Sequence, residues 1–274
     1  MKHCTHPSSS DSLPWNLAAG GYADILMPWF SRYAADAIAW SEISAPSSVL
    51  DVASGPGTLS LLAAERGLRV TAVDLAERMV VSLRHGAASR GLDGVRAVRA
   101  DGEWLPFADG TFEAGFSMFG IIFFPNPLRG LSEMLRVLKP GGLAVIATWQ
   151  PLAATPLLVE LVEAIQAEDE SFSFLEDELS LPGELESAMA ETGFTGVTTR
   201  EATHSLECDS LAQTLERLAE STVPFLVMRQ RLPVEDWNRV WTRAHGRLAR
   251  RFGEGAQSLS YPAWLAAGRK PSAE

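Results

Sequence analysis

Residues 49–60 constrain the fold of this chain more strongly than any other stretch. A short apolar run that contains Asp51 is followed by a Gly-Pro-Gly turn and then by apolar residues at helical spacing. This pattern predicts a strand, a tight turn and a helix. Because Gly55 and Gly57 carry no Cβ atom, the backbone can turn sharply there and a ligand can lie against it. The helix would point its free N–H groups at the same place, so we expect a ligand site at the carboxyl end of this strand.

Strands and helices alternate after this turn, which predicts an α/β fold with a parallel sheet and right-handed crossovers. We expect strands at residues 49–53, 69–74, 95–100, 114–119, 143–149, 197–206 and 259–267. We expect helices at residues 58–66, 76–90, 128–138, 157–168, 183–191, 210–221 and 234–251. No repeat or linker interrupts the pattern, so residues 13–274 are predicted to form a single domain.

Three segments flank or interrupt the expected sheet. Residues 1–12 are polar, and their composition predicts disorder. Residues 13–45 carry aromatic residues at roughly helical spacing around Pro28, which predicts two helices or a kink. These helices would pad the sheet, cover a ligand as a lid, or do both. Residues 46–150 would form the ligand-binding core, and the two helices expected within residues 207–256 would be an insertion over the sheet.

Charge and composition narrow the possible partners. The net charge is −11 and no basic run stands out, which argues against nucleic acid or an anionic membrane surface as a partner. Cys4 and Cys208 are too few for a disulfide framework or a cysteine zinc site, and no metal is expected. Residues 1–12 lack an apolar signal core, and the apolar stretch 116–124 is too short to span a bilayer. These features predict a soluble cytoplasmic protein.

Chemically useful residues follow the first four expected strands, and they should meet in one crevice. These residues are the turn at Gly55 and Gly57, then Asp74, Asp101, and the run Ser117, Met118, Phe119 and Gly120. A carboxylate such as Asp74 can accept both hydroxyls of a ribose, and Asp101 can accept an exocyclic amine of adenine. Met79 and Leu75 would offer apolar faces to the base. Each carboxylate alone would more simply be a helix cap, but the set is compatible with an adenosine.

Two residues indicate whether the adenosine ligand is a dinucleotide or another compound. The dinucleotide fingerprint requires a third glycine, and Ser60 occupies that position. Asp51 would repel a pyrophosphate but suits a ligand with a positive end, such as the ammonium group of an amino acid. An adenosine joined to an amino acid is S-adenosylmethionine.

Residues 49–149 resemble a class I S-adenosylmethionine-dependent methyltransferase, of the group that includes the ubiquinone and menaquinone methyltransferases. The resemblance is carried by five segments in order, at residues 49–57, 73–74, 100–102, 105–113 and 133–142, and by the closing stretch 261–270. The resemblance implies a Rossmann-like doubly wound sheet of seven mostly parallel strands, with the last strand antiparallel and with helical lid elements. Ser54 departs from the family, which often has cysteine there, and Glu113 stands where aspartate is common.

The resemblance also implies roles for residues in this sequence. Gly55 and Gly57 would approach the amino-acid end of the cofactor, Asp74 would hold the ribose, and Asp101 with Gly102 would meet the adenine. Tyr22 stands where such enzymes often place a tyrosine against the cofactor carboxylate. The full expected set for S-adenosyl-L-methionine is Tyr22, Asp51, Ala53, Ser54, Gly55, Gly57, Asp74, Leu75, Met79, Asp101, Gly102, Glu103, Ser117 and Met118.

The methyl acceptor should bind above Phe119, between the N-terminal helices and the insertion. Trp15, Trp29, Phe119 and Trp149 are the expected substrate-binding residues, and aromatic walls suit a flat or greasy small molecule. None of the five histidines stands at a diagnostic spacing, so no catalytic base is assigned.

The sequence therefore predicts an enzyme that transfers a methyl group to a small aromatic or hydrophobic molecule, with secondary metabolites among the candidates. The acceptor atom is left open between oxygen, nitrogen and carbon, and the oligomer between a monomer and a homodimer. A dehydrogenase is disfavoured by Ser60 and Asp51. A non-catalytic protein with the same cofactor, or an enzyme that uses the cofactor in a non-methylating reaction such as a cyclisation, stays a rival.

Overall fold

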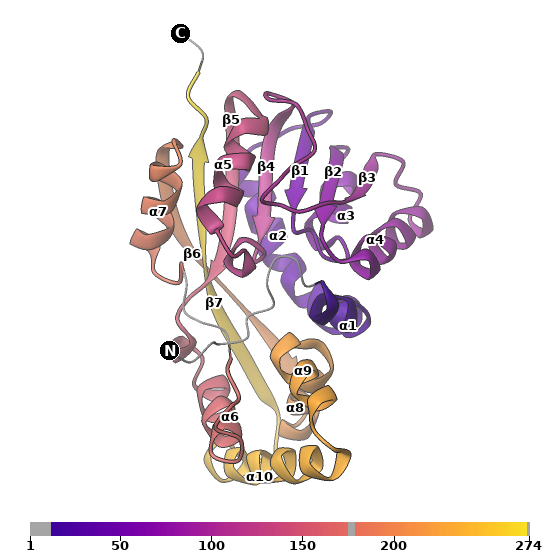
Figure 1. Ribbon diagram of the computed structural model, residues 1–274, viewed down its shortest axis with the longest axis vertical. Coiled ribbons are helices and arrows are strands. Elements are labelled where there is room, and N and C mark those ends of the chain that lie inside the picture. The colour runs from indigo at the N-terminus through magenta and orange to yellow at the C-terminus, as the bar shows by residue number, and fades with distance from the viewer. Residues whose placement is uncertain (1–11, 175–178, 273–274) are drawn as a thin grey trace.

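The computed structural model describes residues 12–174 and 179–272. The expected disorder of residues 1–12 therefore concerns a segment that lies, apart from Ser12, outside the described residues. Seven strands form one sheet in the order β3-β2-β1-β4-β5-β7-β6 (Figure 1). The strands are β1 (Ser48–Val52), β2 (Arg69–Asp74), β3 (Val95–Arg99), β4 (Phe112–Met118), β5 (Leu138–Trp149), β6 (Thr195–Cys208) and β7 (Gln257–Arg269).

The pairing of the strands confirms a mostly parallel sheet. β1 pairs in parallel with β2 and β4, β2 with β3, and β4 with β5. The last strand, β7, is antiparallel to both of its neighbours, β5 and β6. Strands covered on both faces are almost continuously apolar, and β1 shows this, with Asp51 as its buried acidic exception.

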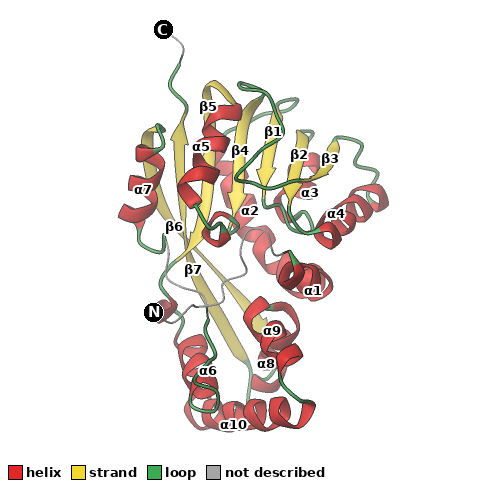
Figure 2. Cartoon of the chain, viewed as in Figure 1, coloured by secondary structure: helices red, strands yellow, loops and turns green. Residues whose placement is uncertain are grey.

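Helices cover both faces of the sheet (Figure 2). One core lies under α2 (Met27–Ser41) and α3 (Thr58–Glu65), with α4 (Glu77–Ser89) beside them, and the other lies under α5 (Pro127–Val137) and α7 (Pro182–Glu191). Each core is built from one face of the central strands, so a doubly wound arrangement follows from burial on both sides.

The N-terminal segment contains two helices, α1 (Leu13–Gly21) and α2, joined by a turn of π-helix at Tyr22–Leu26. Pro28 lies in the first turn of α2, where a missing N–H costs nothing. The regular α-helical pattern is therefore interrupted before the proline, by the π turn. π turns inside helices are frequent at functional sites.

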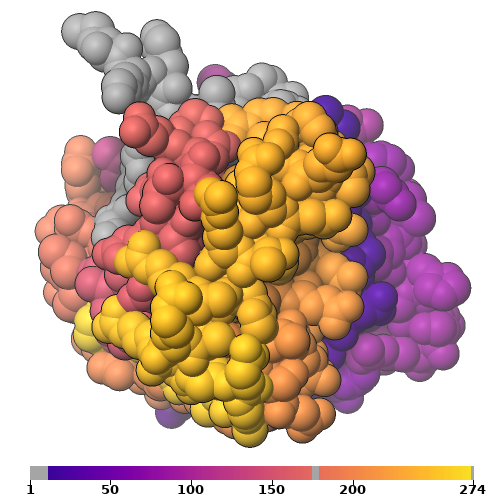
Figure 3. All heavy atoms as spheres, turned by 90° about the horizontal axis from the view of Figure 1, so that it is seen from below, coloured from indigo at the N-terminus to yellow at the C-terminus, as the bar shows by residue number. Residues whose placement is uncertain are grey.

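The far ends of β6 and β7 extend past the other strands and carry a helical layer (Figure 1). This layer contains α6 (Pro156–Gln166), α8 (Leu211–Ser221), α9 (Val223–Arg231) and α10 (Val234–Phe252). The sequence predicts two helices between the last two strands, and this prediction is wrong, because α9 is a third. Seen from below, atoms of the insertion and of β7 make up much of the surface (Figure 3).

Ion pairs between a buried glutamate and two partly exposed arginines join two helices of this layer. The carboxylate of Glu160 on α6 is buried, and it pairs with Arg247 and Arg251 on α10. Within the described ranges, no helix is both long enough and apolar enough to span a membrane.

Candidate functional site

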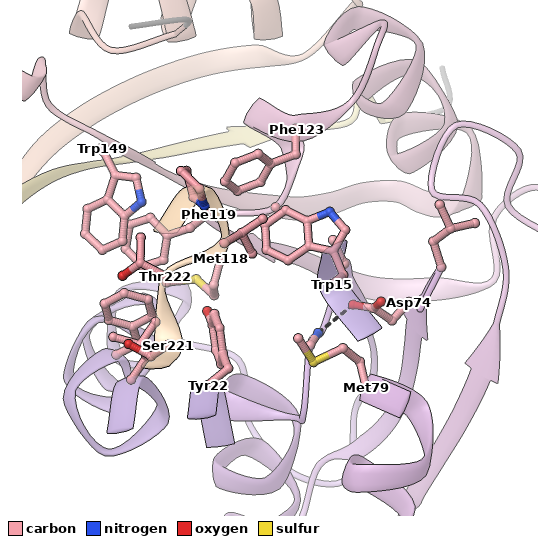
Figure 4. Close-up of a pocket in the computed structure, with 18 of the residues that line it drawn as sticks. Trp15, Tyr22, Asp74, Met79, Met118, Phe119, Phe123, Trp149, Ser221 and Thr222 are labelled. Atoms are coloured by element: carbon pink, nitrogen blue, oxygen red, sulfur yellow. Dashed lines mark hydrogen bonds between the residues drawn. The ribbon is translucent and has the colours of Figure 1, made fainter. Parts of the chain in front are cut away.

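A cavity of about 1390 Å³, its open mouth included, lies over the carboxyl ends of the strands. Its floor comes from the segments that follow β1, β2, β3 and β4, which is the crevice that the sequence predicts. Its cover comes from α1, the π turn, α8 and the start of α9. Figure 4 shows side chains from both sets pointing toward one another.

Asp74 ends β2 and faces this cavity (Figure 4). Its Oδ2 atom accepts a hydrogen bond from the backbone N–H of Gly55 at 2.7 Å, and its Oδ1 atom accepts one from Ala76 at 2.9 Å. Burial raises the pKa of Asp74 to about 6, although these N–H groups act in the opposite direction. The carboxylate thus holds the glycine turn and still has lone pairs for a ligand.

Asp51 lies in the neighbouring strand, and only 1% of it is exposed. The hydroxyl of Ser60 donates a 2.6 Å hydrogen bond to its Oδ2 atom. Ser60, which replaces the third glycine of a dinucleotide fingerprint, therefore positions the unusual acid. Burial raises the pKa of Asp51 to about 7, against the opposing effect of the Ser60 hydroxyl and with a further increase from the charge of Asp74.

A smaller pocket of about 280 Å³ adjoins the main cavity. Asp51, Ser54 and Thr58 line it, and Tyr22, Ala53 and Met118 line both spaces. The Ser54 hydroxyl is buried and has no hydrogen-bond partner among the described residues. Such an orphaned donor in a polar pocket points to a polar ligand group, because leaving it unpaired costs free energy.

Tyr22 begins the π turn and lines both spaces. Its ring meets Phe30 edge-on, with the centroids 5.8 Å apart. Burial, followed by the charges of Asp74 and Asp51, raises the pKa of Tyr22 well above its ordinary value. Its hydroxyl is therefore a protonated donor at any physiological pH.

Two non-glycine residues below the cavity have left-handed backbone conformations. Ala53, after β1, has φ 55°, and Phe119, after β4, has φ 62°. The two strand ends approach closely at Gly120, where a Cβ atom would lie 2.3 Å from the Cβ of Ala53. Conformations of this kind cost about 1–3 kcal/mol each and cluster at ligand sites.

Three residues expected to bind the cofactor do not line the cavity or the adjoining pocket. A Cβ atom on Gly57 would lie 2.2 Å from Leu83 Cδ1, so this glycine permits close packing of α3 and α4. The Glu103 carboxylate turns away and accepts a hydrogen bond from the backbone N–H of Asn126 at 2.8 Å. Ser117 is fully buried within β4. The other expected residues line one space or both, namely Tyr22, Asp51, Ala53, Ser54, Gly55, Asp74, Leu75, Met79, Asp101, Gly102 and Met118.

The four expected substrate residues all line the main cavity. Phe119 and Trp149 stack with centroids 3.6 Å apart and an interplanar angle of 5°, and Trp149 stacks on Tyr261 at 4.4 Å and 3°. Trp15 meets Phe123 edge-on at 4.6 Å (Figure 4). Trp29 is fixed by a 3.1 Å hydrogen bond from its Nε1 atom to the carbonyl of His204.

Sequence reasoning missed the part of the wall that comes from distant segments. The missed residues include Phe123 and Phe124 after β4, Leu218, Ser221, Thr222, Val223 and Pro224 at the junction of α8 and α9, and Tyr261 on β7. The proline at position 224 was an available signal, because proline favours the first turn of a helix. In the part of the chain that the structure describes, no cluster of three or more His, Cys, Asp or Glu residues could hold a metal ion.

Comparisons with known proteins identify the relatives of this chain. Residues 50–146 match the family model of a methyltransferase domain. The demethylmenaquinone methyltransferase of Thermus thermophilus is 41% identical over 109 residues, which cover 39% of this chain and 49% of the relative. The demethylmenaquinone methyltransferase of Beutenbergia cavernae is 34% identical over 169 residues, which cover 57% of this chain and 68% of the relative. The chain thus spans about half to two thirds of these relatives.

A solved structure extends the likeness to the whole chain. The cyclase SpnF aligns with a TM-score of 0.59 at 17% identity, over 99% of this chain and 100% of that chain. At this identity the match shows the fold alone. The alignment covers nearly the whole of both chains, so the general fold is known from a solved structure.

Proposed function

Since the chain belongs to the class I S-adenosylmethionine-dependent methyltransferases, in the group that resembles the quinone methyltransferases, we propose that it methylates a flat or apolar small molecule. One observation carries the proposal: the main cavity and its adjoining pocket bring three carboxylates, those of Asp51, Asp74 and Asp101, together with a stack of aromatic rings. The lining of the cavity includes both the acidic residues Asp74 and Asp101 and the aromatic stack, which supports the binding of a cofactor and an acceptor side by side.

The smaller pocket fits the amino-acid end of the cofactor. Its buried Asp51 would attract an ammonium group, and the unpartnered hydroxyl of Ser54 would donate to a carboxylate. Tyr22 would supply a second protonated donor there. Gly55 lies beside this pocket with φ +56°, so its backbone can approach the ligand without a Cβ atom in the way.

The neighbouring strand ends fit the adenosine. Asp74 would accept the ribose hydroxyls while it holds the Gly55 turn, and Asp101 and Gly102 would lie at the adenine. Met79 is almost fully buried and faces the same cavity, so it would pack on the base. The fit of both ends supports one ligand that combines an adenosine with an amino acid.

Bound in this way, S-adenosylmethionine supplies a methyl group activated by a sulfonium sulfur. The remaining work of the protein is alignment, because holding two reactants in line accounts for much of a transfer barrier. Tyr22 and Met118 line both the polar pocket and the main cavity, so they would lie near the place where the two reactants meet. The cover formed by α1, α8 and α9 would exclude water from this position.

The acceptor would lie against the Phe119, Trp149 and Tyr261 stack. The stacked rings present apolar edges at fixed positions, which suits an aromatic or quinone-like molecule. The two similar relatives are named for a quinone acceptor, which makes a naphthoquinol a reasonable first compound to test.

The experiment is a calorimetric titration with S-adenosylmethionine, S-adenosylhomocysteine and a nicotinamide dinucleotide, followed by incubation with candidate acceptors. Binding of the first two ligands alone, with formation of S-adenosylhomocysteine and a methylated product, is expected. Binding of the dinucleotide alone would overturn the cofactor assignment. Cofactor binding with turnover of an acceptor but no methylated product would favour a non-methylating enzyme.

A matched pair of variants tests the ribose assignment. Asp74→Ala removes a charged acceptor and should weaken cofactor binding, at about 1.5–3 kcal/mol for each lost hydrogen bond. Asp93→Ala changes an exposed carboxylate at the opposite end of the strands and should leave binding unchanged. Equal affinities in the two folded variants would show that the ribose lies elsewhere.

A further inference from the structure

The Trp149 ring is held in a fixed plane at the wall of the cavity. Trp149 is the last residue of β5, and 8% of it is exposed. Phe119 covers one face of the ring and Tyr261 covers the other, with interplanar angles of 5° and 3°. Because both faces are occupied, a ligand can meet this indole only at its edge.

That edge carries a hydrogen-bond donor, the Nε1–H group. An indole Nε1–H can only donate, and in a buried tryptophan it usually finds an acceptor. Trp29, close by, follows this rule and donates to the carbonyl of His204 at 3.1 Å. For Trp149, no acceptor occurs among the residues that the structure describes. Figure 4 shows its ring nitrogen on the side turned toward the other labelled side chains of the cavity.

The surroundings of this donor are mostly apolar. Phe30 lies against the Trp149 ring with a centroid distance of 5.0 Å, and Phe119 fills the adjacent position. The nearby hydroxyl of Ser221 is already engaged, because it donates to the carbonyl of Arg217 at 2.6 Å. A donor that opens to the cavity among apolar groups favours a ligand that brings its own acceptor oxygen to the right place.

We propose that Trp149 determines specificity for the acceptor by donating a hydrogen bond from its Nε1 atom to a carbonyl or phenolic oxygen on a flat ring. The inference rests on the proposed function and names the substrate class of the same site. A ligand without that oxygen leaves the donor unpaired, and sites of this kind discriminate strongly against such analogues. The stacked rings fix the direction of the donor, so they also fix the orientation of the ligand ring.

The test compares 1-naphthol with naphthalene, which differ by one oxygen atom. Trp149→Phe keeps an aromatic ring in the stack and removes the donor. With the cofactor product bound, the wild-type protein should prefer 1-naphthol, and the variant should lose roughly 2- to 10-fold of that preference. Trp29→Phe is the matched control, because its donor is already used within the protein, and it should change both affinities alike.

Separate readouts distinguish this inference from the proposed function. Failure of the wild-type protein to bind S-adenosylmethionine would overturn the proposed function. Normal cofactor binding with an unchanged preference in Trp149→Phe would overturn the role of Trp149 alone. If that variant does not fold, ¹⁵N spectra of the wild-type protein replace it. An indole N–H resonance that persists in Trp15→Phe should then shift with 1-naphthol and not with naphthalene, and equal shifts would overturn the inference.

Discussion

The contact between α1 and α8 gives the sharpest test of how the cavity is covered. A Cβ atom on Gly21, the last residue of α1, would lie 1.9 Å from the carbonyl oxygen of Glu220 and 2.8 Å from its carbonyl carbon. The preceding residue, Gly20, has nothing within 4 Å of the same position. Adjacent glycines thus provide a test variant and its control within one helix.

The magnitude of the perturbation follows from these distances. The Gly21 contact falls about 1.5 Å short of the 3.4 Å at which ordinary contact begins, and the obstacle is backbone, which cannot swing aside. Gly21→Ala must therefore push α1 and α8 apart. Overpacking of this kind costs typically about 1–3 kcal/mol. Gly20→Ala, in an exposed helical position, should instead stabilise the protein by about 0.5–1 kcal/mol.

The assay is urea denaturation combined with calorimetric titration of the cofactor. The free energy of unfolding should differ between the two variants by about 1.5–4 kcal/mol, with Gly21→Ala the less stable. Tyr22 follows Gly21 and Ser221 follows Glu220, and both line the cavity, so Gly21→Ala should also weaken cofactor binding. Equal stability and equal affinity in the two variants would refute the view that α1 and α8 close the cavity through this contact.

Three further predictions concern ionisable groups. Burial raises the pKa of Asp51 to about 7, so the ionised form that attracts a cationic ligand accumulates above that pH. The affinity for S-adenosylmethionine, measured by calorimetry, should therefore increase from pH 6 to pH 8. An affinity that does not change with pH would contradict the role of Asp51. Ser60→Ala removes a hydrogen-bond donor that lowers the pKa of Asp51, so the rise in affinity should occur at a pH about one unit higher than in the wild type. Ser60→Thr keeps a hydroxyl and should keep the wild-type pH profile. Hydrogen bonding to Arg247 lowers the pKa of Glu160, so its stabilising effect is present above its ordinary pKa and is lost as the pH falls through the lowered value. Glu160→Gln should therefore decrease the free energy of unfolding at pH 7 and flatten its decline in acid, and a curve parallel to the wild type would argue against the pair.

The central half of the fold was predictable because its strands are buried on both faces. Such strands are short apolar runs, and β2 has the predicted bounds, Arg69–Asp74. The helix α9 escaped prediction because it is short and its apolar residues follow no clear helical period. Its position over the cavity depends on packing against α1, which local sequence cannot reveal.

The candidate site divides in the same way. Asp51, Asp74 and Asp101 could be assigned because each follows or lies within a strand of the regular half. Gly57 belongs to the same motif, but a Cβ atom there would collide with Leu83 on α4. The glycine at this position is therefore required by helix packing and not by contact with a ligand. The bond from Ser60 to Asp51 joins residues nine positions apart on a strand and a helix, so it became visible only in three dimensions.

This division indicates which part of the chain sets the choice of acceptor. The match to the family model covers residues 50–146 and includes the three acidic residues at the proposed cofactor position. Trp149, Ser221 and Tyr261, which line the aromatic side of the cavity, all lie outside it. Sequence similarity within residues 50–146 therefore constrains the cofactor far more than the acceptor. Two relatives that share this half can differ in substrate through the N-terminal helices, the end of β5 and the insertion, and substitutions at these positions are where a change of acceptor should be sought.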